Sequence, residues 1–172
     1  MSQIWIFVDY DKCSGCRLCE IACSLKHEGA IWTEASRIRV FEYAPGIIVP
    51  HLCRQCYEYH CVKACPTGAL YVDQSTGAVK VDKGKCTLCR KCIEACPIHV
   101  PRVVKNKNHV LICDLCDGNP ECVKACESSG FNSIKVIPRP EKGYLDPYLD
   151  LPEKIASRVG EKIYRGFLKE VM

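Results

Sequence analysis

The chain of 172 residues has no apolar stretch approaching the roughly 18 residues that a transmembrane helix needs. It begins MSQIWIFVDYDKC, which has neither a basic region followed by a long apolar run nor a twin arginine. A glycine-rich phosphate loop, an HExxH motif and a convincing hydrolase triad are also absent. These absences argue against hydrolase chemistry, and we expect a soluble cytoplasmic protein without direct membrane insertion.

Cysteine, in contrast, is abundant: all 16 cysteines fall into four short groups. Each group opens with C-x2-C and closes with x3-C. The first and third groups have the spacing C-x2-C-x2-C-x3-C, and the second and fourth have extra residues before their third cysteine. The groups are Cys13, Cys16, Cys19 and Cys23; Cys53, Cys56, Cys61 and Cys65; Cys86, Cys89, Cys92 and Cys96; and Cys113, Cys116, Cys122 and Cys126.

The third group, CTLCRKCIEACP, matches the bacterial ferredoxin run, in which the fourth cysteine binds a different [4Fe–4S] cluster from the first three. Structural zinc sites prefer two short cysteine pairs with a spacer, and disulfide frameworks are typical of secreted chains. The pattern therefore favours four [4Fe–4S] clusters. Sixteen cysteines fill the ligand positions of four clusters, so we expect the histidines to be structural or to lie beside the clusters: His27, His51, His60, His99 and His109.

The formal charge of +4 counts the cysteines as neutral. Four oxidised clusters with their thiolates, each of net charge about −2, would change it to about −4. The sequence has no basic stripe with interleaved aromatics, so we expect no nucleic-acid partner. Several basic residues either offset cluster charge or form a solvated face: Lys12, Arg17, Arg54, Lys63, Lys85, Arg90, Lys91 and Lys124.

The fourth cysteine of each group must complete a cluster elsewhere, and shared features suggest which groups exchange. The second and third groups share a Cys-Pro end and a connecting hairpin, whereas the first and fourth lack that proline. Nested exchange then gives four ligand sets: set 1, Cys13, Cys16, Cys19 and Cys126; set 2, Cys23, Cys113, Cys116 and Cys122; set 3, Cys53, Cys56, Cys61 and Cys96; set 4, Cys65, Cys86, Cys89 and Cys92. Sequential exchange, of the first group with the second and the third with the fourth, remains an alternative.

Residues between the groups favour short strands and a C-terminal helix. We expect strands at residues 3–9, at 37–50 around a Pro45-Gly46 turn, in a hairpin at 70–82 with Gly77 in its turn, at 109–113 and at 133–137. Proline-rich residues 138–152 are expected to be extended. A helix at 152–171 would carry the apolar stripe Ile155, Val159, Ile163, Phe167 and Val171. The pattern leaves open whether this tail packs on its own core or wraps a partner.

The order of the four groups resembles a known family. CSGCRLCEIAC, CVKACPTGAL, CTLCRKCIEACP and CDLCDGNPECVKAC are similar to the four-cluster electron-transfer subunits of molybdenum and tungsten oxidoreductases. That family includes the iron–sulfur subunits of dimethyl-sulfoxide-reductase-type enzymes and the small subunits of tungsten aldehyde oxidoreductases. The resemblance covers residues 3–137. Residues 57–60 and the missing proline after Cys126 depart from it without removing a ligand.

The resemblance implies an α+β fold of two bacterial-type ferredoxin modules, one nested in the other. Residues 1–50 and 103–137 would form the outer module, 51–102 the inner module, and 138–172 a docking tail of extended chain and helix. It further implies a non-catalytic subunit that relays electrons between a tungsten or molybdenum pterin subunit and an acceptor such as ferredoxin or a further subunit. The short chain favours an aldehyde-oxidising partner.

Three other functions remain open. The chain would carry the same clusters in a hydrogenase or formate-oxidising complex, or as a free polyferredoxin. From another class, a zinc-stabilised interaction module is a remote alternative.

Overall fold

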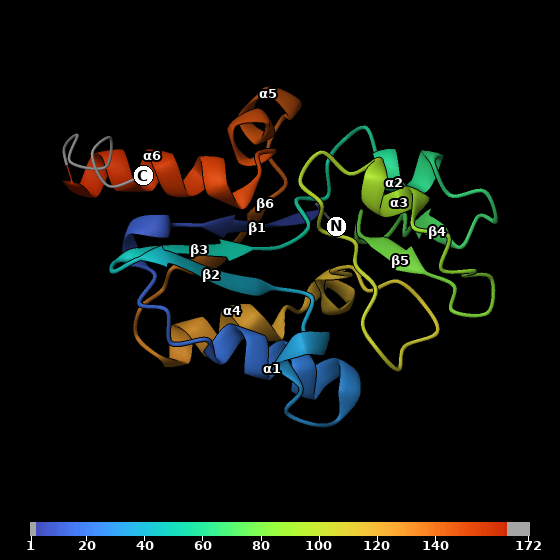
Figure 1. Ribbon diagram of the computed structural model, residues 1–172, viewed down its shortest axis with the longest axis horizontal. Coiled ribbons are helices and arrows are strands. Elements are labelled where there is room, and N and C mark those ends of the chain that lie inside the picture. The colour runs from blue at the N-terminus through green and yellow to red at the C-terminus, as the bar shows by residue number, and fades with distance from the viewer. Residues whose placement is uncertain (1–2, 165–172) are drawn as a thin grey trace.

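The computed structural model describes residues 3–164 and contains three two-stranded antiparallel sheets. One sheet joins distant parts of the chain, because β1 (Ile4–Val8) pairs with β6 (Ile134–Pro138). Helices α1 (Leu18–Glu28) and α4 (Glu121–Ser128) pack against each other below the strands in Figure 1. Residues from both ends of the described chain therefore build one core.

A hairpin of β2 (Arg39–Ala44) and β3 (Ile47–His51) forms the second sheet. Its turn contains the predicted Pro45-Gly46, and Gly46 has a φ of 80°, which glycine adopts without steric cost. All five residues of β3 are buried, since α6 covers one of its faces. The hairpin expected at residues 37–50 is confirmed.

The middle of the chain forms a smaller α/β unit, at the right of Figure 1. Its core combines cysteines with buried aliphatic residues from its sheet and from the segment that follows it. The predicted hairpin at residues 70–82 is present. The elements of this unit are α2 (His60–Lys63), β4 (Leu70–Val72), β5 (Val79–Val81) and α3 (Lys91–Glu94).

The strand expected at residues 109–113 was a wrong prediction. This segment forms only an isolated bridge, in which Leu111 and Arg102 exchange two backbone hydrogen bonds. The segment is nevertheless buried, because its apolar side chains divide between two cores: Val110 and Ile112 pack with the middle unit, and Leu111 packs with Val104. An alternating apolar pattern therefore reflected burial on two sides and not a continued ladder.

The C-terminal segment folds back onto the rest of the chain. Residues 138–152, expected to be extended, contain the helical turn α5 (Lys142–Leu145) and the 3-10 turn η4 (Asp146–Tyr148). Pro147 lies in the first turn of η4, where its missing N–H costs no hydrogen bond. Helix α6 (Pro152–Tyr164) follows, so the predicted helix is present as far as the described residues extend.

Helix α6 packs on β3 of the same chain. Ile155 and Val159 of the predicted stripe are buried against Ile47 and Val49, whereas Ile163 is largely exposed. Phe167 and Val171 lie outside the described residues. The described part of the tail therefore packs on its own core, and its docking to a partner stays a prediction.

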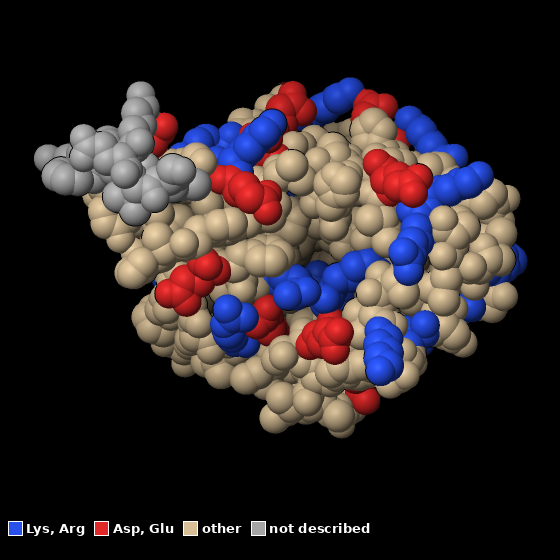
Figure 2. Space-filling view, viewed as in Figure 1, with Lys and Arg blue, Asp and Glu red and all other residues tan. Residues whose placement is uncertain are grey.

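The remaining helical turns are short: η1 (Tyr10–Lys12), η2 (Thr33–Ala35) and η3 (Leu115–Gly118). Among the described helices, none is both long enough and apolar enough to cross a bilayer. Acidic and basic side chains are interspersed over the face drawn in Figure 2.

Candidate metal centres

Every cysteine group contains the same backbone turn. The residue before the second cysteine has a positive φ in all four groups: Gly15 (74°), Gln55 (47°), Leu88 (56°) and Leu115 (58°). The left-handed region disfavours residues with a Cβ, and non-glycine residues persist there where surrounding structure holds them, often at functional sites. The turn curls each C-x-x-C segment so that its cysteines share one side of a loop.

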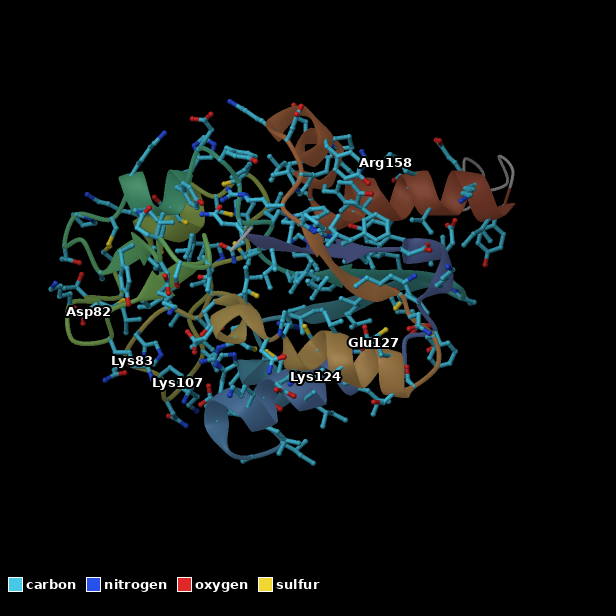
Figure 3. All side chains as sticks on the ribbon, turned by 180° about the vertical axis from the view of Figure 1, so that it is seen from behind. Asp82, Lys83, Lys107, Lys124, Glu127 and Arg158 are labelled. Carbon is cyan, nitrogen blue, oxygen red and sulfur yellow. The ribbon has the colours of Figure 1, made fainter. Side chains whose placement is uncertain are left out.

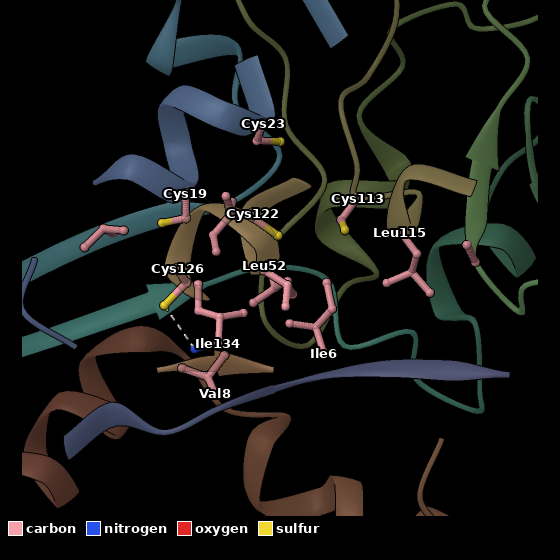
Figure 4. Close-up of a cluster of buried hydrophobic side chains, with 14 of the residues drawn as sticks. Ile6, Val8, Cys19, Cys23, Leu52, Cys113, Leu115, Cys122, Cys126 and Ile134 are labelled. Atoms are coloured by element: carbon pink, nitrogen blue, oxygen red, sulfur yellow. Dashed lines mark hydrogen bonds between the residues drawn. The ribbon is translucent and has the colours of Figure 1, made fainter. Parts of the chain in front are cut away.

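The first group and the end of the fourth group meet beside α1 and α4. Cys13, Cys16, Cys19 and Cys126, which are the residues of set 1, line one small cavity of about 20 Å³. The Ile134 backbone N–H donates to the Cys126 Sγ at 3.4 Å, as drawn in Figure 4. Cys126 therefore lies with the first group although it is 107 positions from Cys19, from the residue numbers.

Two similar cavities lie in the middle unit. Cys53, Cys56, Cys61 and Cys96, the residues of set 3, line one cavity of about 20 Å³. Cys65, Cys86, Cys89 and Cys92, the residues of set 4, line another of the same size. In both, the fourth cysteine of one group joins the first three of another.

The cysteines of set 2 are also neighbours. Cys23, Cys113 and Cys116 each lie near enough to Cys122 to raise its pKa by charge repulsion, after the larger effect of burial. Cys19, Cys23 and Cys113 all appear around Cys122 in Figure 4. The Cys23 Sγ accepts a hydrogen bond from the Arg37 backbone N–H at 3.2 Å. The thiols thus group as nested exchange predicts, and their binding of iron stays a prediction.

The donor set fits an iron–sulfur cluster. Burial, followed by repulsion from neighbouring thiolates or carboxylates, raises the pKa of Cys19 and of Cys61 to about 12 and that of Cys53 well above its usual range. Four crowded thiolates in such surroundings need a positive centre to compensate them. Iron supplies that charge, and its binding would displace the thiol protons.

Two sets lie nearer the surface than the others. Cys16 of set 1 and Cys89 of set 4 are exposed, whereas every cysteine of sets 2 and 3 is buried or half-buried. Sets 1 and 4 are thus the more accessible sites for a partner.

A buried glutamine connects the two parts of the molecule. The Gln55 Nε2 donates to the Cys113 carbonyl at 2.7 Å, and the Gln55 Oε1 accepts from the Val79 N–H at 2.9 Å. Its backbone N–H donates to the Cys53 Sγ at 3.4 Å. Gln55 therefore lies between sets 2 and 3, a role that no local pattern in the sequence indicated.

His27 lies beside set 2. Its Nε2 is 3.7 Å from the Cys116 Sγ and 3.5 Å from an Asp114 carboxylate oxygen. Burial lowers the pKa of His27, so its neutral form is favoured. These three groups lie close enough together to ligate a cation. Because Cys116 belongs to set 2, we regard His27 as a neighbour of that set rather than as part of another site.

Other histidines and tyrosines near the groups have structural contacts. The His51 Nε2 lies 2.9 Å from the Ile98 carbonyl, and burial lowers the pKa of His51 to about 4. Tyr57, expected to shield a cluster from water, donates its hydroxyl to the Pro140 carbonyl at 2.8 Å. The guanidinium of Arg139 lies 4.3 Å from the centre of the Tyr57 ring. Tyr57 thus ties the C-terminal segment to the second cysteine group.

The eight basic residues beside the cysteine groups differ sharply in burial. Seven are exposed: Lys12, Arg17, Lys63, Lys85, Arg90, Lys91 and Lys124. Water and salt screen exposed charges strongly, so the solvated-face interpretation suits these seven. Arg54 is buried and lines the cavity of set 3.

Comparison with protein families gives two matches. The 4Fe-4S dicluster domain matches residues 45–136, which is more than half of the chain, and a 4Fe-4S binding domain matches residues 10–26. Together the two matches include all four cysteine groups.

Several curated proteins are similar to most of the chain. The polyferredoxin-like subunit of aliphatic sulfonate oxidoreductase from Pyrococcus furiosus is 51% identical over 162 residues, covering 94% of both proteins. The B subunit of the anaerobic dimethyl sulfoxide reductase from Escherichia coli is 34% identical, covering 73% of this chain and 70% of that protein. A solved structure of the active site complex BamBC of benzoyl coenzyme A reductase aligns over 98% of both proteins, with 24% identity and a TM-score of 0.47.

Proposed function

This protein belongs to the 4Fe-4S dicluster family, and from this premise we propose that sets 1 to 4 each hold one [4Fe–4S] cluster. The observation that carries the proposal is the convergence of sixteen cysteines into four groups of four, three of them around small cavities. When bound, each cluster accepts and returns one electron. The protein's relatives are iron–sulfur subunits of oxidoreductase complexes, and we infer a non-catalytic, electron-transferring role.

The neighbours of the sets support a linear order. Cys19 of set 1 lies near enough to Cys122 of set 2 to affect its pKa, and Cys113 of set 2 does the same to Cys53 of set 3. Cys61 of set 3 is similarly affected by Cys92 of set 4. We propose that electrons pass along sets 1, 2, 3 and 4. Buried thiols in the middle exclude water, and the exposed Cys16 and Cys89 mark the two ends.

The nested modules are part of the same proposal. The pairing of β1 with β6 and the packing of α1 on α4 support an outer module of residues 1–50 and 103–137. The packing of α2 on α3 and the pairing of β4 with β5 support an inner module of residues 51–102. Gln55 would then hold the inner module against the outer one through the Cys113 carbonyl.

The partner we propose is a catalytic subunit with a tungsten or molybdenum pterin that oxidises aldehydes, with ferredoxin or a further subunit as the acceptor. This assignment rests on the resemblance of the cysteine groups and the short chain. The 51% identity to a subunit of an aliphatic sulfonate oxidoreductase favours a second candidate, a catalytic subunit that acts on aliphatic sulfonates. We propose a cytoplasmic location, because a reducing compartment keeps sixteen cysteines free for iron.

Anaerobic isolation of the tagged protein with its partners tests this function. We expect about 16 iron and 16 sulfide per chain, absorption that bleaches on reduction, and a co-purifying subunit that contains tungsten or molybdenum. Adding an aldehyde or an aliphatic sulfonate to the complex should then reduce the clusters, and the effective substrate identifies the partner. Stoichiometric zinc without sulfide would contradict the proposal. A protein loaded with clusters but isolated alone would indicate a free polyferredoxin, and a hydrogenase or formate-oxidising partner would replace the proposed one.

A further inference from the structure

Arg54 lies between the first two cysteines of the second group, and its side chain lines the cavity of set 3. Only 1% of the residue is exposed. Its Nη2 donates to the Tyr10 hydroxyl at 2.6 Å, and its Nη1 donates to the Ile6 carbonyl at 3.4 Å. The guanidinium also lies 5.8 Å from the centre of the Trp5 ring and 5.5 Å from that of Tyr148.

These partners do not neutralise the positive charge of Arg54. A hydroxyl, a carbonyl and two aromatic rings are all neutral groups, and the buried Nε has no hydrogen-bond partner among the described residues. A charge buried without an opposite charge costs several kcal/mol, and arginine does not escape this cost by losing its proton. The location therefore calls for a negative group on the side of Arg54 that faces set 3.

We propose, on the basis of the function proposed above, that Arg54 is the counter-ion of the cluster in set 3 and raises the reduction potential of that cluster. Reduction adds one negative charge to a cluster that is already negative. A fixed cation in low-dielectric surroundings stabilises the reduced form more than the oxidised form. The effect is local, because the other seven basic residues beside the groups are exposed and screened.

The sequence position of Arg54 strengthens its coupling to set 3. It follows Cys53 directly, and the Trp5 Nε1 donates to the Arg54 carbonyl at 2.8 Å, which fixes its backbone. Side-chain contacts from β1, η1 and η4 then fix the guanidinium. An alternative role for Arg54 is purely structural: it would only brace these three elements. That role predicts a loss of stability without a change in the potential of one cluster.

The test compares Arg54→Met with Arg54→Lys, two substitutions of similar volume that differ by one charge. Arg158→Met is the matched control, because it removes one positive charge from an exposed arginine on α6, labelled in Figure 3. Each protein is purified anaerobically and analysed for iron and sulfide. The midpoint potentials of its clusters are then measured by redox titration followed by electron paramagnetic resonance. Cys56→Ser, which alters a ligand of set 3, identifies the signal of that cluster.

We expect Arg54→Met to lower one midpoint potential, that of the signal changed by Cys56→Ser. The reduced-to-oxidised ratio of this cluster at a fixed potential should fall at least tenfold, which is about 59 mV for a one-electron couple. Arg54→Lys should restore most of the shift, and Arg158→Met should leave all potentials unchanged.

Unchanged potentials in Arg54→Met, equal shifts in Arg54→Met and Arg54→Lys, or a shift shared by all clusters would overturn the inference. If Arg54→Met fails to assemble, Arg54→Gln takes its place; assembly with lysine but with no neutral residue supports the charge role, and failure with lysine as well contradicts it. Low iron in the unmodified protein would instead refute the proposed function.

Discussion

Gly15 shows how a single residue shapes a cysteine group. Its φ is 74°, and a Cβ at this position would lie 2.9 Å from the Cδ1 atom of Ile48. Gly29 has a similar φ of 70°, but a Cβ there would meet no described atom within 4 Å. The two glycines share a backbone requirement and differ in contacts, so they form a matched pair.

We expect Gly15→Ala to reduce the occupancy of set 1, because the backbone strain adds to a contact beside Cys16. Gly29→Ala should cost about 1 kcal/mol of unfolding free energy with full iron content. Iron analysis and the thermal midpoint, followed by the visible absorption, measure both effects. Equal behaviour of the two variants would show that the turn before Cys16 has no special role in holding the cluster.

Gln55 is the second residue whose replacement is informative. Gln55→Leu would leave the Val79 N–H and the Cys113 carbonyl without their buried partner, at about 1–3 kcal/mol each. We expect a lower thermal midpoint and a weaker magnetic interaction between the clusters of sets 2 and 3. Gln74→Leu, at an exposed turn position, is the control and should change neither. Retention of the interaction in Gln55→Leu would argue against Gln55 as the link.

The sequence reveals these residues to different degrees. Sixteen cysteines and their spacing indicate the sets, because ligand spacing is local. The left-handed turns are signalled only at Gly15, since Gln55, Leu88 and Leu115 adopt positive φ through the surrounding structure. The burial of Arg54 was hidden because its partners come from residues 5–10 and 148, far from it in the sequence.

At the scale of elements, the predicted strands at the N-terminus, in both hairpins and at residues 134–138 are confirmed. They alternate or end in turn residues, which are local signals. The strand at 109–113 and the extended segment at 138–152 were wrong for tertiary reasons. Burial between two cores mimicked a strand, and the contacts of Tyr144 and Tyr148 with Trp5 accompany helical turns in a proline-rich stretch.

Helix α6 offers a prediction about the tail. Ile155 is 2% exposed on β3, whereas Ile163 of the same helix is 45% exposed. Ile155→Ala should cost about 2–5 kcal/mol of local stability, and Ile163→Ala less than about 0.5 kcal/mol. Hydrogen exchange of α6 amides measures this difference, and iron content should not change. Equal exchange in the two variants would contradict the packing of α6 on β3.

A charged contact joins the end of α1 to the connection between the proposed modules. Glu28 accepts hydrogen bonds from Arg37 and Lys107, and its side chain is 6% exposed. Burial pushes the pKa of Glu28 upward, but hydrogen bonds from Lys107 and Arg37 outweigh it, so the pKa lies below its usual range. The carboxylate is thus favoured in the folded state, and its contribution to stability is present above the unfolded pKa.

We expect Glu28→Gln to lower the thermal midpoint at pH 7 and equally at pH 6. The difference from the unmodified protein should shrink only as the pH falls below about 4.3, the pKa of glutamate in the unfolded chain. Scanning calorimetry across this range measures it. A difference that already disappears between pH 7 and 6 would assign the effect to another group.

At the scale of the whole molecule, four thiol sets lie in one line between two accessible ends. This arrangement depends on the ligand exchange, which joins residues 13–19 to Cys126 and residues 53–61 to Cys96. Such long-range grouping was predicted from shared features of the cysteine groups, whereas the neighbours that link one set to the next come only from the structure.

The exchange of ligands is tested most directly by Cys126→Ser. The variant is purified anaerobically, and its clusters are compared by electron paramagnetic resonance with those of Cys16→Ser and Cys56→Ser. We predict that Cys126→Ser and Cys16→Ser alter the same cluster, because both residues belong to set 1. If Cys126→Ser instead alters the cluster that Cys56→Ser alters, the ligand sets proposed for this protein are wrong.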